Sequence, residues 1–370
     1  MTLNPINFFH THISQGAASN IAEVLASSFI SEGKLVSEFE NQLSSHLGIR
    51  NPIALNSGTS ALHLALVLSG IKPGDEVILP PQTFIASGLA VKHASAVPIF
   101  ADIQYETGNI DPNSIRNKLS EKTKAIMVVH WGGYPCDMTE ILKISEEFRI
   151  PVVEDAAHAL GATYRGTPIG AISPFTCFSF QAIKHVTTGD GGAIAFIDEK
   201  LAATARKLRW FGIDRSSSPM STLGERIYNT REVGYKYHMN DYAAALGLSN
   251  LNGFTDRLNH LRKVTALYRE GLKNVVGLDL FRQDSDREGA CWLFGVHVQH
   301  REEFVRKMKT MNIPVSVVHQ RIDRNDVFGG KCPDLTMQAK FDSTQIHLPI
   351  NSSINDDQVR YVIDSVREGW

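Results

Sequence analysis

One lysine stands in a run of aromatic, small and glycine residues, Phe178-Ser179-Phe180-Gln181-Ala182-Ile183-Lys184-His185-Val186-Thr187-Thr188-Gly189-Asp190-Gly191-Gly192. Upstream of it, an apolar stretch leads into two carboxylates, Val152-Val153-Glu154-Asp155. A lysine and an aspartate in such settings are what pyridoxal phosphate (PLP) requires of a protein. The lysine forms a Schiff base with the cofactor aldehyde, and the aspartate keeps the ring nitrogen protonated. Lys184 and Asp155 therefore predict an enzyme that acts on amines and carbonyls.

The residues around this pair offer further cofactor contacts. A buried carboxylate needs a cation, because unpaired burial costs several kcal/mol, and a protonated pyridine nitrogen would supply it to Asp155. His158 could hydrogen-bond the ring, although a structural histidine fits that position equally well. Phe84 ends the segment Pro80-Pro81-Gln82-Thr83-Phe84 after an apolar run and could stack on the ring. A core phenylalanine is the alternative.

The segment Asn56-Ser57-Gly58-Thr59-Ser60 opens a helical pattern and predicts a phosphate cradle. Glycine and small hydroxyl residues at a helix start leave main-chain N–H groups free at the positive end of the helix dipole. We expect Gly58, Thr59 and Ser60 to bind the cofactor phosphate, with the Ser179 hydroxyl assisting. Taken alone, the segment also fits an ordinary helix cap.

The glycines at 189–192 resemble a nucleotide-binding loop, but they precede a strand and do not open a helix. The dinucleotide-binding fingerprint requires a helix directly after the glycines, so this segment does not match it. The glycines more simply allow the main chain to turn tightly beside Lys184.

Composition and charge exclude several classes of protein. The 370 residues include 37 basic and 39 acidic side chains without long blocks, which argues against a nucleic-acid or membrane surface. Four scattered cysteines lack metal-ligand spacing, so we expect no metal and a reducing compartment. No signal-peptide pattern or apolar run of about 20 residues occurs. We expect a cytoplasmic protein.

Apolar runs alternate with helical patterns from residue 53 to 196, which predicts an α/β fold with a mostly parallel sheet. The expected strands cover 76–79, 97–101, 125–130, 151–154 and 193–197, and the expected helices cover 60–68, 85–93 and 138–148.

The C-terminal part mixes strands and helices without strict alternation and predicts a smaller α+β domain. Its expected helices cover 241–272, 302–311 and 356–367, and its expected strands cover 291–298 and 315–319. We expect a large cofactor domain over residues 1–245 and a small domain over 246–370, with the first residues, up to about 30, packing on the small domain.

Four segments resemble the PLP-dependent nucleotide-sugar aminotransferases of the DegT/StrS type: residues 56–66, 154–158, 178–192 and Gly234-Tyr235-Lys236-Tyr237-His238-Met239-Asn240. The similarity runs from Gly33 through Pro349. It implies the aspartate-aminotransferase fold (fold type I) and a homodimer with active sites at the subunit interface.

The resemblance also assigns roles. It makes Lys184 the Schiff-base lysine, Asp155 the partner of the ring nitrogen, and Phe84 and His158 the contacts on opposite ring faces. The stretch 234–240 resembles a loop that reaches into the neighbouring subunit, where either His238 or Asn240 touches the phosphate. A plain helix-leading loop is the alternative.

Substrate contacts are expected in the stretch 315–325, where His319, Arg321 and Arg324 could bind a sugar-nucleotide diphosphate. A solvated polar loop is an equal alternative. Trp131, at the end of a strand, could shape the sugar pocket.

The implied reaction is a ping-pong transamination from an amino acid, with L-glutamate expected, to a keto group at carbon 3 or 4 of a nucleotide-linked deoxysugar. The product would serve surface polysaccharide or a glycosylated metabolite. Some relatives carry histidine at the lysine position and remove a hydroxyl, so Lys184 favours transamination. The alternatives are a PLP-dependent sugar dehydratase or other lyase, a non-catalytic PLP-binding regulator, and a sugar-nucleotide oxidoreductase without PLP. The last would need a glycine fingerprint that opens a helix, and this sequence has none.

Overall fold

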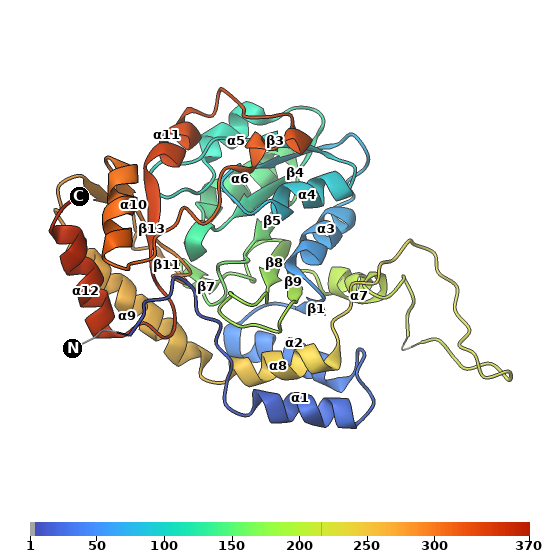
Figure 1. Ribbon diagram of the computed structural model, residues 1–370. Helices are drawn as coiled ribbons and strands as arrows, with labels where there is room; N and C mark the ends of the chain where they lie inside the picture. Colours follow the sequence, from blue (N-terminus) through green and yellow to red (C-terminus); the bar gives the residue numbers. More distant parts are fainter. Residues whose placement is uncertain (1–3, 216) are drawn as a thin grey trace.

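The computed structural model describes residues 4–215 and 217–370 (Figure 1). A seven-stranded sheet in the order β1-β9-β8-β5-β4-β2-β3 forms its centre. Neighbouring strands from β8 to β3 run parallel, and β9 runs antiparallel to both β8 and β1. The strands are β1 (Ile53–Leu55), β2 (Glu76–Leu79), β3 (Val97–Phe100), β4 (Thr123–Val129), β5 (Val152–Asp155), β8 (Phe175–Ser179) and β9 (Gly192–Phe196).

Two helical layers cover the faces of this sheet. Along β4, Ile126 and Val128 pack into one apolar cluster, and Ala125 and Met127 pack into the other. This period of two is expected of a strand, and burial on both faces explains why β4 is apolar from Ala125 to Val129. The first layer contains α2 (Lys34–Leu47), α6 (Met138–Phe148) and α8 (Asp241–Leu251), and the second contains α3 (Gly58–Leu68), α4 (Ala86–His93) and α7 (Glu199–Leu208).

A second sheet of three antiparallel strands, in the order β10-β12-β13, has its own apolar core. Its elements are β10 (Leu278–Leu280), β12 (Phe294–Val298), β13 (Gln345–Leu348), α9 (Phe254–Leu272), α10 (Arg301–Thr310) and α12 (Asp356–Arg367). The remaining elements are α1 (Ala17–Ala26), α5 (Pro112–Lys118), α11 (Thr336–Thr344), the short strands β6 (Thr163–Tyr164), β7 (Thr167–Pro168) and β11 (Arg287–Glu288), and the 3₁₀ turns η1 (Trp131–Gly133), η2 (Ile322–Arg324) and η3 (Asp326–Phe328).

The expected elements of the large sheet are confirmed to within two residues at each end. The expected helix over 241–272 is wrong as a single element, because Gly253 adopts a left-handed conformation with φ of 68° and separates α8 from α9. The expected strand over 315–319 is also wrong. In that segment Ser316 pairs with His347 in an isolated bridge, and Val318 has a positive φ of 61°.

The domain boundary at residue 245 stays a prediction, and that residue lies inside α8. The start of the described chain contacts α12, because the Gln358 side chain donates to the carbonyl oxygens of Asn4 and Pro5. Helix α1 packs instead against α8. Within the described part of the chain, none of the helices has both the length and the apolar character needed to cross a membrane.

A buried ion-pair cluster ties the first helices to the large sheet. Arg209, with a side chain 1% exposed, contacts Glu40 and Glu32, and it donates to the carbonyl oxygen of Ala54 in β1. Arg206 contacts the same Glu40 at 2.8 Å from a half-exposed position.

We predict that Arg209→Met lowers the free energy of unfolding by about 3 kcal/mol, because it leaves a buried carboxylate without its main partner. Arg206→Met is the matched control, and it should cost less than about 1 kcal/mol, because the Arg206 side chain is half exposed and Glu40 keeps its buried partner Arg209. Urea unfolding of the two variants measures the difference. Equal losses would contradict this view of the cluster.

Candidate active site

The carboxyl edge of the parallel strands carries a pocket of about 420 Å³. Strand ends of this kind are where α/β sheets bind ligands. The pocket brings together eight of the residues that the sequence singled out, from segments far apart in the chain: Gly58, Thr59, Phe84, Asp155, His158, Ser179, Lys184 and His319.

Asp155 ends β5 as a buried carboxylate without a cation. Ser87 donates to its Oδ2 at 2.7 Å, and the Ala157 amide donates to its Oδ1 at 3.2 Å. Among the described residues it forms no ion pair within 4.0 Å. Burial raises the pKa of the Asp155 carboxyl, and the Ser87 hydrogen bond opposes that shift. A ligand that places a cation beside Asp155 would therefore stabilise its buried negative charge.

The neighbouring Glu154 is, by contrast, already satisfied. Successive residues of a strand point to opposite faces, and the Glu154 side chain lies 2.7 Å from His130 Nε2 with both groups fully buried. Thr176 Oγ1 and the Ser173 amide also donate to it. The structure thus distinguishes two adjacent carboxylates and leaves only Asp155 facing the pocket.

Lys184 lies in the loop between β8 and β9. Its Nζ is 3.8 Å from the centre of the Trp292 ring. Burial lowers the pKa of Lys184 to about 7, against the opposing effect of Asp155. Near neutral pH a large share of the amine is therefore uncharged, which is the form that attacks an aldehyde or accepts a proton.

Aromatic side chains line the pocket near this lysine. His158 stacks on Trp292, with ring centres 3.7 Å apart, and its Nδ1 has no hydrogen-bond partner in the described structure. Phe84 is 53% exposed and lies 5.1 Å from the His319 ring. The alternative of a core phenylalanine is therefore wrong. Burial lowers the pKa of His319 to about 4 and that of His158 well below its usual value.

The start of α3 forms one wall of the pocket. The first helical hydrogen bond runs from the Ala61 amide to the Ser57 carbonyl, so the amides of Gly58 and Thr59 precede it. A Cβ on Gly192 would lie 2.5 Å from the Gly58 nitrogen, so glycine there lets β9 approach the helix start. The cap is Ser57, a residue that the sequence reasoning did not single out; its Oγ accepts from the Ser60 amide at 3.0 Å.

Ser60 itself is placed differently from the expectation. Its hydroxyl donates to Asn56 Oδ1 at 2.7 Å and also contacts Ser57 Oγ, and Ser60 does not line the pocket. The structure thus argues against a phosphate contact from its hydroxyl in this conformation.

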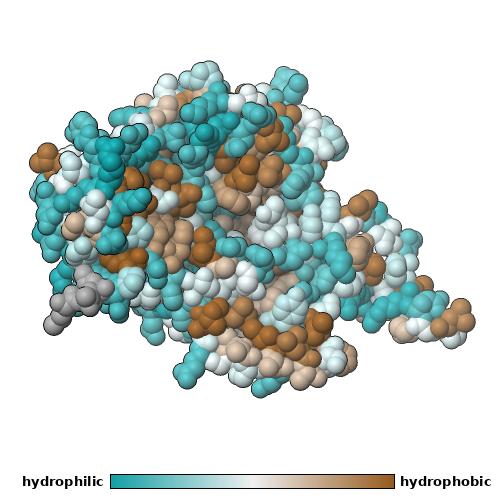
Figure 2. Space-filling view, in the orientation of Figure 1, coloured by the Kyte–Doolittle hydropathy of each residue, from teal (hydrophilic) through white to brown (hydrophobic). Residues whose placement is uncertain are grey.

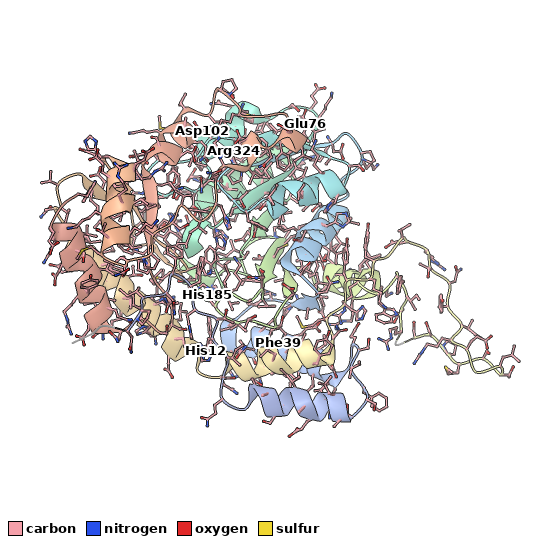
Figure 3. All side chains as sticks on the ribbon, viewed as in Figure 1. His12, Phe39, Glu76, Asp102, His185 and Arg324 are labelled. Carbon is pink, nitrogen blue, oxygen red and sulfur yellow. The ribbon has the colours of Figure 1, made fainter. Side chains whose placement is uncertain are left out.

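Three of the four expected substrate residues lie outside this pocket. Arg321 is buried and forms a two-pronged ion pair with Asp323, with Nε to Oδ1 at 2.7 Å, so its guanidinium is not available to a diphosphate in this chain. Arg324 contacts Gln320 and, as Figure 3 shows, lies apart from His185, the residue after Lys184. Trp131 is buried beside His158 and does not line the 420 Å³ pocket.

His238 and Asn240 also lie outside this chain's own pocket. The His238 ring packs 4.1 Å from that of Trp210, and the Asn240 amide donates to the Tyr242 hydroxyl at 3.0 Å. A contact with a neighbouring subunit stays a prediction for both residues.

The pocket fits PLP in four respects. It offers a buried carboxylate without a cation, an amine with a lowered pKa, free amides at a helix start, and flat rings beside the lysine. Sheet and pocket together define an α/β enzyme of the aspartate-aminotransferase type.

The chain belongs to the DegT/DnrJ/EryC1/StrS aminotransferase family, whose sequence pattern matches residues 12–367. GDP-perosamine synthase from Escherichia coli O157:H7 is 30% identical, over 94% of this chain and 94% of its own length. The crystal structure of the sugar aminotransferase CalS13 from Micromonospora echinospora matches with a TM-score of 0.94 and 31% identity, over 99% of this chain and 100% of that chain. Spr1654 from Streptococcus pneumoniae, solved in its PLP form, matches with a TM-score of 0.89 and 26% identity, over 99% and 98% of the two chains.

These matches confirm the expected family, fold class and enzyme class: the protein is an aminotransferase. The roles of the individual residues stay predictions. The sequence reasoning missed Ser87 and Trp292, which contact Asp155 and Lys184 from distant segments, and no local pattern marks either of them.

We predict that Lys184 in the cofactor-free protein reacts with acetic anhydride at a rate that reaches half its plateau near pH 7. The lysine is charged and unreactive below that pH, because its pKa is lowered to about 7. Asp155→Asn should move the midpoint to lower pH, because the Asp155 charge favours the ammonium form. Asp190→Asn, also at the pocket, is the control and should leave it unchanged. Peptide mass spectrometry measures the labelling; an unshifted midpoint in Asp155→Asn would contradict the coupling.

Proposed function

We propose that this protein is a PLP-dependent transaminase that moves an amino group from an amino acid, with L-glutamate expected, to a keto group of a nucleotide-linked deoxysugar. The observation that carries the proposal is the convergence of Lys184, Asp155 and the start of α3 on one pocket. A relative named GDP-perosamine synthase supports a sugar nucleotide as the substrate class.

In this proposal, Lys184 Nζ holds PLP covalently and Asp155 faces the pyridine nitrogen. The amides of Gly58 and Thr59, with the Ser179 hydroxyl, bind the phosphate, and His158 and Phe84 contact the ring. Bound there, PLP supplies an electron-withdrawing ring that acidifies the adjacent carbon of the amino substrate.

Lys184 also serves as the proton carrier. A general base works best when its pKa lies near the working pH, and that of Lys184 is lowered to about 7. Asp155 keeps a negative charge opposite the ring nitrogen, which stabilises negative charge that develops on the reacting carbon. His158 and His319 have lowered pKa values, so they add hydrogen-bonding groups to the pocket without adding positive charge near neutral pH.

A homodimer belongs to the proposal. Residues 217–234 project from the body as a long arm (Figure 1), with Leu223 87% and Val233 83% exposed. Apolar side chains also gather over α1 and α8 (Figure 2), and Phe29 beside them is 84% exposed. Apolar surface of this kind is typical of a protein interface. No arginine lines the 420 Å³ pocket within the described chain, so a second subunit is the expected source of cations for the diphosphate.

A PLP-dependent sugar dehydratase and a non-catalytic regulator remain the alternative functions. Absorbance of the PLP-loaded protein separates them from a transaminase. L-Glutamate should bleach the near-ultraviolet to visible band of a transaminase, and a keto sugar should restore it. A dehydratase or a regulator should not respond to glutamate in this way.

We predict that a panel of nucleotide-linked keto sugars, supplied with L-glutamate, identifies at least one that drives release of 2-oxoglutarate. Lys184→Ala should abolish this release, because no second lysine of the described chain lines the pocket, although the variant should still bind the pyridoxamine form. Full activity in Lys184→Ala would end the assignment. If none of the sugars drives release of 2-oxoglutarate, nucleotide-linked keto sugars are not the substrates.

We predict that Asp155→Asn folds but loses about 100-fold or more of its turnover rate, the size typical of losing a positioned electrostatic partner. Asp190→Asn serves again as the control, because Asp190 lies at the pocket edge. Steady-state kinetics of the two variants makes the comparison, and an unchanged rate in Asp155→Asn would remove that residue from the mechanism.

A further inference from the structure

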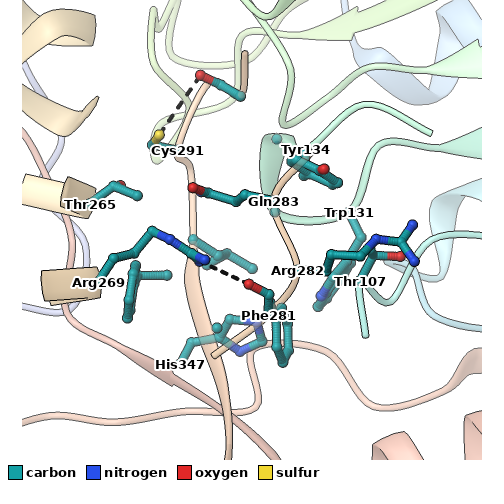
Figure 4. Close-up of a pocket in the computed structure, with 16 residues that line it drawn as sticks. Thr107, Trp131, Tyr134, Thr265, Arg269, Phe281, Arg282, Gln283, Cys291 and His347 are labelled. Atoms are coloured by element: carbon teal, nitrogen blue, oxygen red, sulfur yellow. Dashed lines mark hydrogen bonds between the residues drawn. The ribbon is translucent and has the colours of Figure 1, made fainter. Parts of the chain in front are cut away.

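A second, smaller cavity of about 60 Å³ lies between the turn η1 of the large domain and the elements α9 and β12 of the small domain (Figure 4). It is separate from the 420 Å³ pocket, with which it shares no lining residue. Its polar groups include side chains that the proposed reaction does not use: Trp131, Arg269 and His347.

Arg269 carries an uncompensated positive charge into this cavity. Its guanidinium is half-buried, and Nη1 donates to the Phe281 carbonyl oxygen at 2.8 Å (Figure 4). Across residues 4–215 and 217–370 it forms no ion pair, and none of the residues that line the cavity is acidic. Burial lowers the pKa of Arg269, as expected for a cation without a carboxylate partner. A guanidinium with free donors in such a place favours an oxyanion.

Two buried nitrogens in the cavity wall have no hydrogen-bond partner in the described structure. They are Nε1 of Trp131, a residue 2% exposed, and Nε2 of His347, a residue 1% exposed. The indole nitrogen can only donate. His347 Nδ1 lies 3.2 Å from the Ser316 carbonyl oxygen and so carries the hydrogen, which leaves Nε2 as an acceptor. Burial lowers the pKa of His347 to about 3, so this neutral form prevails.

We propose that this cavity is a binding site for a small oxyanion that also carries a hydroxyl group, such as monohydrogen phosphate or hydrogen carbonate. The anionic oxygens would accept from Arg269 and Trp131, and the hydroxyl would donate to His347 Nε2. Unpaired buried polar groups are rare in native proteins, and a ligand of this kind would supply partners for both orphaned nitrogens and a counter-charge for Arg269. A single water needs about 10–15 Å³, so the cavity has room for a larger molecule.

The site lies directly behind a wall of the proposed active site. The Trp131 ring is 5.8 Å from that of His158 and 5.9 Å from that of His319, and both histidines line the 420 Å³ pocket. A ligand bound to Trp131 Nε1 would therefore support these histidines from behind without touching the cofactor.

The test is calorimetric titration of the PLP-loaded protein, in which the cofactor's own phosphate position is filled. Inorganic phosphate and hydrogen carbonate are titrated separately at pH 7.5, and the tighter of the two identifies the ligand. Sulfate has the charge but no hydroxyl at this pH, so it should bind several-fold more weakly. Arg269→Gln should weaken binding about 10-fold or more, the loss of one charge-assisted hydrogen bond.

Arg367→Gln is the matched control, because Arg367 also donates to a main-chain carbonyl, that of Gly271, but lies outside the cavity. It should bind as tightly as the wild type. If Arg269→Gln does not fold, Arg269→Lys replaces it and should show intermediate binding. The absence of saturable binding, equal affinity in the Arg269 variant and the wild type, or equal affinity for sulfate and phosphate would each overturn the proposal.

Discussion

The architecture of the active site depends on one buried carboxylate. Asp155 ends a central strand, where apolar residues drive the main chain into the core, and its side chain emerges at the edge of the sheet with a hydroxyl and an amide as donors. These two bonds do not cancel the cost of burying a negative charge. The adjacent Glu154 has a histidine partner within the protein. The fold therefore pairs Glu154 within the protein and leaves Asp155 to be paired by a ligand.

The parallel sheet explains why the remaining groups meet Asp155. Parallel strands end at a common edge, so the loop after β8 and the helix after β1 arrive at the same place from distant parts of the chain. Close approach then depends on glycine: a side chain at Gly192 would collide with the main chain of Gly58. Lys184 loses hydration in this packing, which lowers its pKa to about 7. The same packing thus positions Lys184 and lowers its pKa.

Local chemistry made much of this site predictable from the sequence. Lys184 and Asp155 carry short, distinctive surroundings, and the start of α3 has the composition of a cap. Contacts between distant segments were not predictable: Trp292 reaches Lys184 from the segment before β12, and Ser87 reaches Asp155 from α4. The sequence showed the charge of Arg321 but not its pairing with Asp323, which depends on the bend at η2.

Several of the polar groups that the described chain leaves unsatisfied lie where its two sheets meet. Among the residues described, His347 Nε2, in β13 of the second sheet, and Trp131 Nε1, just after β4 of the first, have no hydrogen-bond partner, and Asp155 at the end of β5 has no cation. Each sheet can complete its own core by periodic apolar packing, but the surface between them is formed by loops and strand ends, whose polar groups point in many directions. Some of these groups, such as Trp131 Nε1 and His347 Nε2, find no hydrogen-bond partner in the described chain. The region between the two sheets is therefore where this chain has both unsatisfied polar groups and cavities that could hold ligands.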